Sequence, residues 1–593
     1  MMERPRRLSF LEACNLMNVR NEYSTERVRD DGEDADEMDG ANDENLSSDD
    51  GDMAMIEEGG SSSDSDSDSE SLISQFEDRS TGEAVGDENL HADGIAYSLE
   101  PISPSRRSRN ILTEVPRPLV NPENELSAFE LFISEDVLLL IQRFSNRKAS
   151  DLRRNIRSPP SYTCDFSISE IRACIGITIR AGSDRDNFTA VDDLWQKNDS
   201  RPFYRATMSL HRFKFFLRCV RFDNFRSRAE RQQSDVLAAI REFWDIFSTS
   251  LLRFYVPDSV LTIDEQLVGY RGSIPGRTYI PSKPRKYGLK IFWICESSTG
   301  YVLKGLIYSG RRPGEPIHRN LAKDVVLELC EPFHHTNRDI VTDNFFTSHS
   351  LAVDLLKIGL TLLGTMRSNR RELPAFIKDK NNMQQYESKF VFDHKNKITI
   401  AAYCPKRHRQ VILLSSSHTN KDVCNDQKQK PVLILDYNVG KGGVDRMDQA
   451  VESFTCRRKT VRWPLLIFYN CLDIAAFNAF VILNKNNYQC DRKQFLRRLS
   501  FLLCKEYAEE RIRTNKFLSN DSLLCASLCG YEIDRDEDIR PHLTSNVQVR
   551  GPRRCFSCKK QARSKCSICS KSVCPMHRRD LKKFFCYDCF SHK

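Results

Sequence analysis

The first 100 residues of this 593-residue chain contain no lysine, and no basic residue of any kind falls between Asp30 and Asp78. Twenty acidic residues occupy that interval, which includes the run SSSDSDSDSESL. Such a segment has too little apolar surface to offset the entropy that is lost on ordering. We therefore expect residues 1–115 to form a disordered acidic N-terminal region.

The rest of the chain has the opposite charge. Residues 1–100 hold 29 acidic residues and seven arginines, whereas the other 493 residues hold 53 acidic residues against 82 lysines and arginines. The formal charges of the two parts are thus −22 and +29. A basic folded part favours a polyanionic partner, most often nucleic acid, and a solvated basic surface is the plain alternative.

A signal peptide and an uninterrupted membrane span are also lacking. The opening MMERPRRLSFLEACNL has neither an adequate apolar core nor a cleavage site. Residues 463–483 are long enough to cross a bilayer, but Asn470, Asp473 and Asn478 interrupt them. We expect a buried core helix in a soluble protein. Fourteen of the 21 cysteines are scattered singly, which is typical of buried thiols in a reducing compartment.

The length predicts three to five domains, and no internal repeat is present. Helical apolar spacing recurs before residue 258, β-like runs follow, and helical sequence returns after Cys456. The run 432–438 is predicted to be a strand of the same sheet. The expected units are a helical domain (116–258), an α/β sheet domain in two parts (259–372 and 431–455), a β-rich insertion between them (373–430), a second helical domain (456–540) and a linker with a cysteine-rich domain (541–593).

Four aspartates stand in distinctive settings. Asp264 and Asp343 each follow an apolar β-like run, where a buried strand is expected to reach the surface. Asp445 and Asp448 follow a glycine pair and share one face of the predicted helix. Carboxylates gathered in this way suit two divalent ions. Because each acid alone is equally well explained as an ordinary strand-end or surface residue, the prediction depends on the combination.

Basic side chains flank these acids, and such clusters neutralise phosphates. For any single cluster a solvated face is an equally good explanation. The candidate DNA-binding residues are Lys283, Arg285, Lys286, Lys290, Arg367, Arg370, Arg457, Arg458, Lys459 and Arg462.

The last 39 residues hold four chelating pairs, in which two ligands are separated by two residues. Eight soft ligands fill two tetrahedral zinc sites, and a module this small depends on metal for its folding. Crossed pairing of the first with the third pair and the second with the fourth is favoured, and sequential pairing stays open. A ubiquitin-ligase RING also has two crossed zinc sites, but its histidine falls earlier among the eight ligands, whereas His577 is the sixth here. The predicted zinc ligands are Cys555, Cys558, Cys566, Cys569, Cys574, His577, Cys586 and Cys589.

Several longer strings give the chain, from about residue 118 onward, a resemblance to the piggyBac family of DNA transposases. They are LTIDEQLVGYRG (261–272), YIPSKPRKYGLK (279–290), TDNFFTS (342–348), GTMRSNRRELP (364–374), YNVGKGGVDRMDQ (437–449) and TCRRKTVRWP (455–464). The resemblance implies an RNase H-like catalytic core of the α/β class. It implies that Asp264, Asp343 and Asp445 take the three catalytic positions and that Asp448 matches a fourth acid.

The same resemblance implies the chemistry and the partners. Family members use Mg²⁺ or Mn²⁺ to cut the 3′ ends of the transposon, pass through hairpin ends and join DNA at TTAA sites. We therefore expect a nuclear homodimer in which the helical domains supply dimer contacts and DNA binding and the zinc domain reads terminal inverted repeats. The alternative is a domesticated, catalytically silent protein that binds DNA or chromatin in a sequence-specific way.

Overall fold

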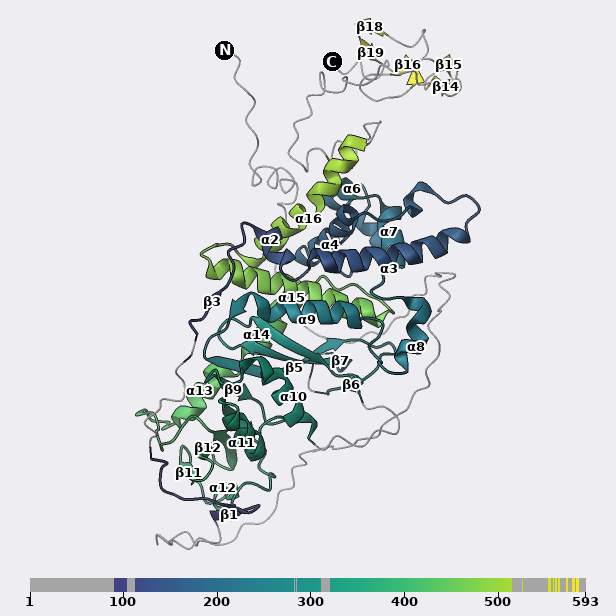
Figure 1. The fold of residues 1–593 in the computed structure, drawn as a ribbon. Coiled ribbons are helices and arrows are strands. Elements are labelled where there is room, and N and C mark those ends of the chain that lie inside the picture. Colours follow the sequence, from purple (N-terminus) through teal and green to yellow (C-terminus); the bar gives the residue numbers. More distant parts are fainter. Residues whose placement is uncertain are drawn as a thin grey trace, which may run out of the picture. The chain divides into compact units, whose positions relative to one another are not determined.

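The computed structural model describes most of the chain between residues 90 and 514 and parts of the C-terminal region (Figure 1). Contacts divide the chain into two compact units, residues 1–531 and 532–593. The described residues are 90–103, 112, 114–281, 283, 285–310, 320–514, 525, 553–555, 558, 560–562, 564–565, 572–573, 579–581 and 583–585.

A mixed sheet of nine strands, counted over the described residues, lies at the centre of the first unit (Figure 1). The strand order is β11-β12-β13-β10-β9-β5-β7-β6, and β8 also pairs with β7. β9 runs parallel to β5 and β10, while the other pairs are antiparallel. This confirms the predicted α/β class. The strands are β5 (Val260–Gly269), β6 (Arg277–Tyr279), β7 (Tyr287–Glu296), β8 (Val302–Ile307), β9 (Asp339–Thr342), β10 (Thr361–Met366), β11 (Ser388–Asp393), β12 (Ile398–Lys406) and β13 (Arg409–Ser415).

The three strands predicted as an insertion, β11 to β13, belong to this sheet. Leu363 of β10 lies opposite Ser415 of β13, so the antiparallel trio extends the sheet beyond β10. Their alternating residues close a second, smaller core around Val341, Phe392 and Leu413. The sequence shows three strands here, but it does not show which edge they join, because pairing partners are set by long-range packing.

The predicted strand at 432–438 is instead a helix, α13 (Val432–Gly440). Pro431 stands at its N-cap, and Leu433 and Ile434 are buried against the smaller core. A short apolar run has no periodicity that separates a buried strand from a buried helix, which explains the error. α14 (Gly443–Ser453) follows at once and carries Asp445 and Asp448, as predicted.

The helices that precede the sheet domain in the sequence and those that follow it pack together in one helical layer. α4 (Ile168–Ser183) and α16 (Arg492–Thr514) pack so closely that a Cβ on Gly176 would lie 2.6 Å from Sγ of Cys504. Figure 1 shows α4 next to both α16 and α3. The other helices of this layer are α2 (Glu125–Glu130), α3 (Glu135–Arg154), α5 (Val191–Leu194), α6 (Pro202–Thr207), α7 (Leu210–Cys219), α8 (Arg228–Gln232) and α9 (Arg241–Arg253).

Caps begin the main helices where the sequence indicates. Ser167 and Glu170 form a capping box at the start of α4, and the hydroxyl of Ser209 accepts the backbone N–H of Arg212 in α7. Ser134 is the N-cap of α3, but its hydroxyl makes no capping hydrogen bond. The remaining helices and strands of the first unit are α10 (Leu321–Cys330), α11 (His349–Lys357), α12 (Ala375–Lys378), β1 (His91–Ala92), β2 (Ile95–Ala96), β3 (Arg117–Pro118) and β4 (Tyr255–Val256).

α15 (Trp463–Lys485) is the one helix of the described residues with the length and apolar composition of a membrane span. It is buried almost continuously from Leu465 to Leu483, as predicted for a core helix. Its polar interruptions make specific contacts. The Asn478 amide exchanges two hydrogen bonds of 2.9 Å with the backbone of Val302 on β8. Asp473 accepts hydrogen bonds from Thr455 and Cys456, which precede the helix.

Residues 90–103 differ from the disorder predicted for residues 1–115. β1 and β2 form a hairpin whose turn residues Asp93 and Gly94 have φ of +50° and +76°, as a type I′ turn requires. Ser98 then pairs with Phe392 of β11 through two hydrogen bonds. Ile102 is buried in the smaller core. The acidic composition of the whole region conceals this short Asp-Gly hairpin and its apolar anchors.

The described parts of the second unit are short antiparallel pairs. β14 (Arg553–Arg554) pairs with β15 (Gln561–Ala562), and the turn between them contains Cys555 and Cys558. The other pairs are β16 (Ser564–Lys565) with β17 (Ser572–Val573), and β18 (Arg579–Leu581) with β19 (Lys583–Phe585).

Candidate active site

Two of the four predicted acids lie at adjacent positions on neighbouring strands. β5 and β9 run parallel with Ile263 opposite Thr342, so Asp264 and Asp343 come next on their strands. Asp343 directly follows the end of β9, as predicted. β5 continues past Asp264 to Gly269, so Asp264 lies in mid-strand rather than at a strand end. The parallel register thus brings two residues 79 positions apart in sequence to one place on the sheet.

Helix α14 brings the other two acids onto the same strand. The hydroxyl of Thr262 donates to the Gly440 carbonyl at 2.6 Å and accepts the N–H of Gly443 at 3.3 Å. A Cβ on Gly443 would lie 2.6 Å from that hydroxyl, so the helix start needs glycine to approach the strand this closely. Four residues along β5, the Gln266 amide donates to Oδ1 of Asp448 at 2.8 Å.

These two anchors bracket Asp264. Thr262, Asp264 and Gln266 lie on the same face of the strand, because every second side chain of a strand points to the same side. α14 lies along this face from its first residue to Asp448. Asp445, which precedes Asp448 by one turn, is exposed on the helix and interacts electrostatically with Asp264.

The electrostatics show that the acids affect one another. Burial, and then the negative charges of Glu265, Asp343 and Asp445, raise the pKa of Asp264 to about 7. Burial also raises the pKa of Asp343, although the Phe345 N–H donates to its Oδ1 at 3.0 Å. Desolvation disfavours the charged form of a carboxyl group, and nearby carboxylates disfavour it further. The negative charges around Asp264 therefore raise its pKa further than burial alone would.

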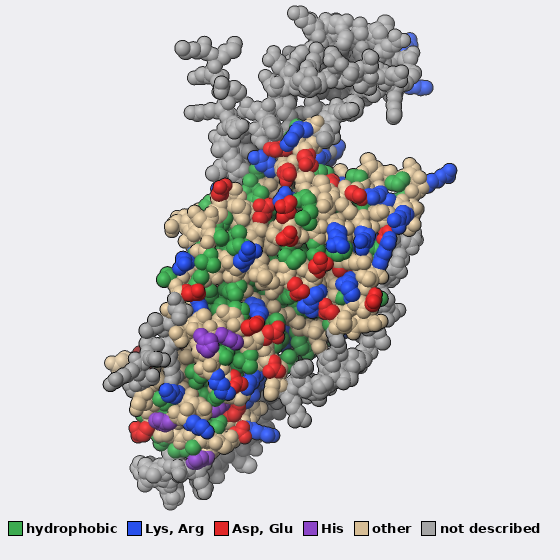
Figure 2. All heavy atoms as spheres, viewed as in Figure 1, with side chains coloured by type: hydrophobic (Ala, Val, Ile, Leu, Met, Phe, Trp, Pro, Cys, Tyr) green, Lys and Arg blue, Asp and Glu red, His purple; other side chains and the backbone are tan. Residues whose placement is uncertain are grey.

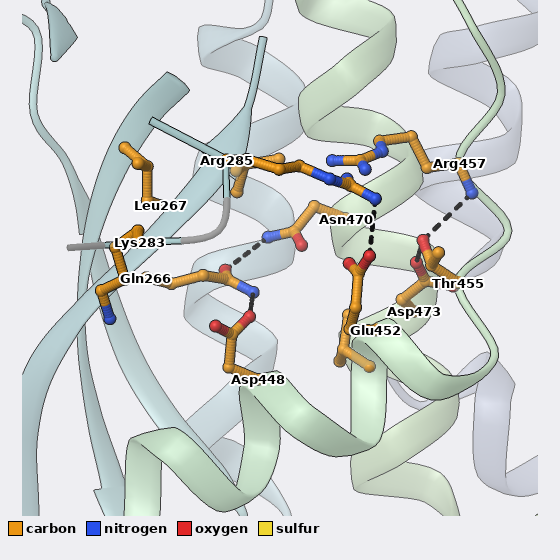
Figure 3. A pocket seen from close by; sticks show the side chains of 12 residues that line it. Gln266, Leu267, Lys283, Arg285, Asp448, Glu452, Thr455, Arg457, Asn470 and Asp473 are labelled. Carbon is orange, nitrogen blue, oxygen red and sulfur yellow. Dashed lines mark hydrogen bonds and ion pairs between the residues drawn. The ribbon is translucent and has the colours of Figure 1, made fainter. Parts of the chain in front are cut away.

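Asp448 belongs to a hydrogen-bond network as well as to the acidic cluster. Its partner Gln266 accepts a hydrogen bond from Nε1 of Trp293 at 3.0 Å. Gln266 also accepts one from the Asn470 amide at 2.9 Å (Figure 3). Trp293 is fully buried and lies opposite Asp264 on β7. Burial raises the pKa of Asp448, while the Gln266 hydrogen bond and the charge of Lys283 oppose this rise. The network joins β5, β7, α14 and α15 at one point.

Two residues near the acids were not singled out by the sequence. Among the charged side chains, Glu265 raises the pKa of Asp264 and of Asp343 the most. The phenol of Tyr437 on α13 has a pKa that is raised by burial and then by Asp343, Asp264 and Asp445. Glu265 adjoins Asp264 in the string LTIDEQ, so its position was a signal, whereas Tyr437 lay in a run predicted as a strand.

The donor chemistry of these acids fits a divalent cation. Carboxylate oxygens are the preferred ligands of Mg²⁺ and Mn²⁺. The charges that act most strongly on Asp264 are all negative, so a cation placed among them would favour its ionised form. Within the described parts of the chain, no three His, Cys, Asp or Glu side chains stand ready as a metal site. The carboxylates share one surface but do not form a closed cage.

A pocket of about 130 Å³ opens beside Asp448 (Figure 3). Arg285 and Arg457 extend toward each other across it, and Arg285 pairs with Glu452 of α14 at 2.6 Å. Arg285 also covers Gly269, where a Cβ would lie 2.4 Å from its Cδ. The other residues that line the pocket are Gln266, Leu267, Val268, Lys283, Asp448, Val451, Thr455, Asn470 and Asp473.

The predicted phosphate-binding residues near the first two acids lie around this site. Lys286 is exposed, and Lys283 is half-buried at the pocket. The ammonium of Lys290 lies over the rings of Phe292 and Phe345, at 5.5 and 5.3 Å from their centres. On the other side, Arg367 donates to Asn344 at 3.1 Å and Arg370 to the Thr347 carbonyl at 3.0 Å, beside Asp343.

The last basic cluster divides between surface and interior. Lys459 is exposed, whereas Arg458 is buried and donates to the Thr189 carbonyl at 2.6 Å. Arg462 donates to the carbonyls of Leu217 and Val220 at the end of α7. The guanidinium groups of Arg458 and Arg462 contact backbone carbonyls of the helical layer, and phosphate contact by these two arginines stays a prediction. Spacing along the chain does not show which of several consecutive basic residues faces inward.

Of the predicted zinc ligands, two fall within the described residues. Cys555 is buried, and Cys558 packs against it in the turn of the β14–β15 hairpin. The N–H of Cys555 donates to the Lys560 carbonyl at 2.7 Å, which closes the turn. The other six predicted ligands lie outside the described residues: Cys566, Cys569, Cys574, His577, Cys586 and Cys589.

A mixed sheet that carries acids on adjacent strands, with an acid-bearing helix across them, is an arrangement of the transposase class. A family model described as Transposase IS4 matches residues 124–480, which is more than half of the chain. The chain belongs to this transposase family, and its piggyBac-type relationship follows from relatives in sequence and structure.

The structural match is to a piggyBac transposase solved as a synaptic complex with hairpin DNA. The TM-score is 0.69 with 32% sequence identity, over 80% of this chain and 100% of that one. Two human relatives are PiggyBac transposable element-derived protein 3, 23% identical over 377 residues, and PiggyBac transposable element-derived protein 2, 21% identical over 376 residues. Each alignment covers 59% of this chain, and the chain spans 60% of the length of each relative.

Proposed function

We propose that this protein is a DNA transposase of cut-and-paste type that breaks and joins phosphodiester bonds with Mg²⁺ or Mn²⁺. The observation that carries the proposal is the acidic cluster of Asp264, Asp343 and Asp445, in which the pKa of Asp264 rises to about 7. Asp264 and Asp343 are desolvated carboxyl groups placed beside further acids, and such an arrangement is typical of a functional site.

Asp264, Asp343 and Asp445 would hold the ions. Bound there, divalent ions supply an activated nucleophile and stabilise the leaving 3′ oxygen. The protein supplies rigid placement. Asp264 is fixed within a central strand, and Asp343 is fixed by the Phe345 N–H and by a turn in which the Thr347 N–H donates to the Asp343 carbonyl at 3.2 Å. Pre-positioned ligands contribute because reacting groups gain rate from orientation that is set in advance.

Asp448 has a different part in this proposal. Its hydrogen bond to Gln266 fixes α14 against β5 and so fixes Asp445 one turn away. We therefore assign it as a positioning residue that acts through Gln266. Its carboxylate faces the pocket, together with Lys283, Arg285 and Arg457, which suit the phosphates next to the cleaved bond.

Binding of double-stranded DNA follows from the basic charge and from the structural relative. The part of the chain after residue 100 has a formal charge of +29, and the matched structure is a transposase with hairpin DNA. On the face drawn in Figure 2, lysine and arginine side chains gather over the part of the helical layer where α3 and α7 lie in Figure 1. These side chains suit the phosphate backbone rather than the bases.

The finer assignments come from the family resemblance. We propose that the sheet, α13 and α14 form an RNase H-like core, that hairpin ends are intermediates, and that insertion occurs at TTAA. Concerted cutting of two ends requires a homodimer, and access to chromosomes requires a nuclear location. The C-terminal unit would bind two zinc ions and read terminal inverted repeats, which its described pair Cys555 and Cys558 supports by sharing one tight turn.

A second candidate is a catalytically silent DNA- or chromatin-binding protein with the same fold. The human relatives are named as transposable element-derived proteins, and fold alone does not determine whether a site is used. Excision from a donor plasmid that carries the element's own ends tests the two. Wild-type excision that is lost in Asp264→Asn supports the transposase. DNA binding without excision in the wild type would support the silent protein.

A further inference from the structure

We infer that the exposed pair Tyr279 and Tyr287, on the β6–β7 hairpin, is a stacking platform for unpaired bases of the DNA substrate. The inference rests on the proposed DNA-transposase function and deepens it. It adds to phosphate-binding residues a surface that recognises DNA whose bases have left the double helix.

The two rings are paired with each other and open to solvent. Tyr279 and Tyr287 lie directly opposite each other on β6 and β7, with ring centres 4.7 Å apart. Their exposed fractions are 50% and 46%, although large aromatic side chains usually lie inside. Among the described residues they form an exposed aromatic pair at the β6 end of the central sheet. Exposed aromatic faces at fixed spacing are what successive bases stack on.

Positive charge surrounds the rings. The Arg277 guanidinium lies 5.7 Å from the centre of the Tyr287 ring. Lys286 is exposed beside Tyr287, and its carbonyl accepts the N–H of Ile280 at 2.8 Å, which closes the hairpin base. Aromatic rings combined with basic side chains are typical of surfaces that bind single-stranded nucleic acid. The side chains named here, Arg277 and Lys286, are basic, which favours a polyanionic partner over a protein partner that buries apolar side chains.

The hairpin is tied to the acidic cluster and to another basic loop. The N–H of Tyr270, the residue after β5, donates to the Tyr287 carbonyl at 2.9 Å. The Tyr270 hydroxyl donates to the Val461 carbonyl at 2.6 Å, which holds the loop of exposed Lys459 next to the hairpin. Arg285 within the hairpin pairs with Glu452, one turn beyond Asp448 on α14.

These ties set the reach of the platform. Six residues separate Asp264 from Tyr270 along an extended strand, which corresponds to about 20 Å at roughly 3.3 Å per residue. Stacked nucleotides advance by about 3.4 Å, so the rings would meet bases about six nucleotides from the cleaved bond. Breaking a strand and folding its end back exposes bases over such a span, which fully paired DNA does not do.

The test compares two DNA probes on the full-length protein. One is a fluorescent, fully paired duplex, and the other is the same duplex with a short internal stretch of unpaired thymines. We expect Tyr279→Leu/Tyr287→Leu to weaken binding of the unpaired probe about 10-fold or more, with binding of the paired duplex unchanged within about twofold. Tyr279→Trp/Tyr287→Phe, which keeps both rings, should retain the preference of the wild type.

Two further variants separate this effect from general loss of binding. Phe188→Leu removes another exposed ring, with an exposed fraction of 61%, and should leave both affinities unchanged. Lys286→Gln should weaken the binding of both probes and lower the salt slope of binding by about 1. If the leucine double variant loses affinity for both probes equally, or for neither, the inference is overturned. The proposed DNA binding by the wild type is unaffected by that result. Failure of the wild type to bind either probe overturns the proposed function itself.

A change of oligomeric state would point elsewhere. If the leucine double variant keeps its preference for the unpaired probe but sediments as a smaller species than the wild type, the tyrosine pair is a contact between copies of the chain. That result would reject the platform. Both leucine substitutions remove exposed rings, so melting temperature should match the wild type and confirm that the variant is folded.

Discussion

Gln266 donates a hydrogen bond from its amide nitrogen to Oδ1 of Asp448 at 2.8 Å, across 182 residues of sequence. The same amide oxygen accepts from Trp293 and Asn470, so Gln266 has a partner in three other elements of the fold. This relationship separates Asp448 from the other acids. Asp264 and Asp343 accept hydrogen bonds from the backbone N–H groups of Glu265 and Phe345, whereas Asp448 accepts one from a side chain of another element.

The first prediction distinguishes positioning from metal binding at Asp448. Asp448→Asn keeps an acceptor oxygen for Gln266, so we expect DNA cleavage to stay within about tenfold of the wild type. Asp448→Ala leaves the Gln266 amide unpaired, which costs about 1–3 kcal/mol and releases α14. A misplaced catalytic group costs on the order of 100-fold in rate, so alanine should reduce cleavage by that amount. Single-turnover nicking of end DNA measures both. Loss of about 1000-fold in both variants would instead make Asp448 a metal ligand.

The second prediction concerns the three proposed metal ligands. Asp264→Asn, Asp343→Asn and Asp445→Asn should each reduce nicking by about 1000-fold or more, because amide oxygens bind and neutralise divalent ions poorly. Binding of end DNA should persist, since these acids contribute repulsion to it. Asp324→Asn, an exposed acid on α10, is the matched control and should be fully active. Normal nicking in any of the three variants would remove that residue from the site.

The third prediction follows from the raised pKa of Asp264. Its folded pKa of about 7 exceeds the ordinary value of 3.8, so between about pH 4 and 7 the folded chain binds more protons than the unfolded chain. Stability without metal therefore falls as pH rises through this window. Asp264→Asn removes the effect and should raise the melting temperature above pH 7 by roughly 1–3 °C, with no gain near pH 4.

Mg²⁺ provides the matching control for this pH experiment. It should stabilise the wild type at neutral pH, because a cation among the acids favours their charged forms, and it should stabilise Asp264→Asn much less. Differential scanning fluorimetry across pH, with and without Mg²⁺, measures both effects. A melting temperature of the variant that is lower than that of the wild type at neutral pH, in the absence of metal, would contradict the electrostatic account.

The fourth prediction separates neighbours in the last basic cluster. Lys459→Gln should lower the salt slope of DNA binding by about 1 and leave stability unchanged, because Lys459 is exposed. Arg458→Met should leave the slope unchanged and lower stability by about 1–3 kcal/mol, since it removes the buried hydrogen bond to Thr189. Binding titrations over a series of salt concentrations, together with urea unfolding, measure the pair. Reversed results would place Arg458 at the DNA.

The fifth prediction addresses the C-terminal unit. Native mass spectrometry of the full chain should detect about two zinc ions, as eight ligands at this spacing require. Cys558→Ala should lose one or both, whereas Cys490→Ala, a cysteine just before α16, should retain both. Removal of zinc by chelation should abolish binding to the terminal repeats. Unchanged repeat binding in excess chelator would exclude the proposed reading role.

Local signals in the sequence were sufficient for most strands and helices. Capping residues and apolar spacing place α4, and β11 to β13 lie within the region predicted to be β-rich. The prediction of a strand at 432–438 was wrong because the apolar residues of this run show no periodicity. Only packing against the smaller core decides that the run is helical. The prediction of disorder was wrong for residues 90–103, because the acidic composition of the region outweighed a short turn signal at Asp93 and Gly94.

By itself, the sequence determined which side chains are available for chemistry: the four aspartates, the basic clusters and the spaced zinc ligands. It did so because residue type and near-neighbour spacing are local properties. Only the tertiary structure decided that parallel pairing aligns Asp264 with Asp343, that Gln266 holds Asp448, and that Arg458 faces inward. Those outcomes depend on strand register and helix docking, which are set by contacts between residues far apart in the chain.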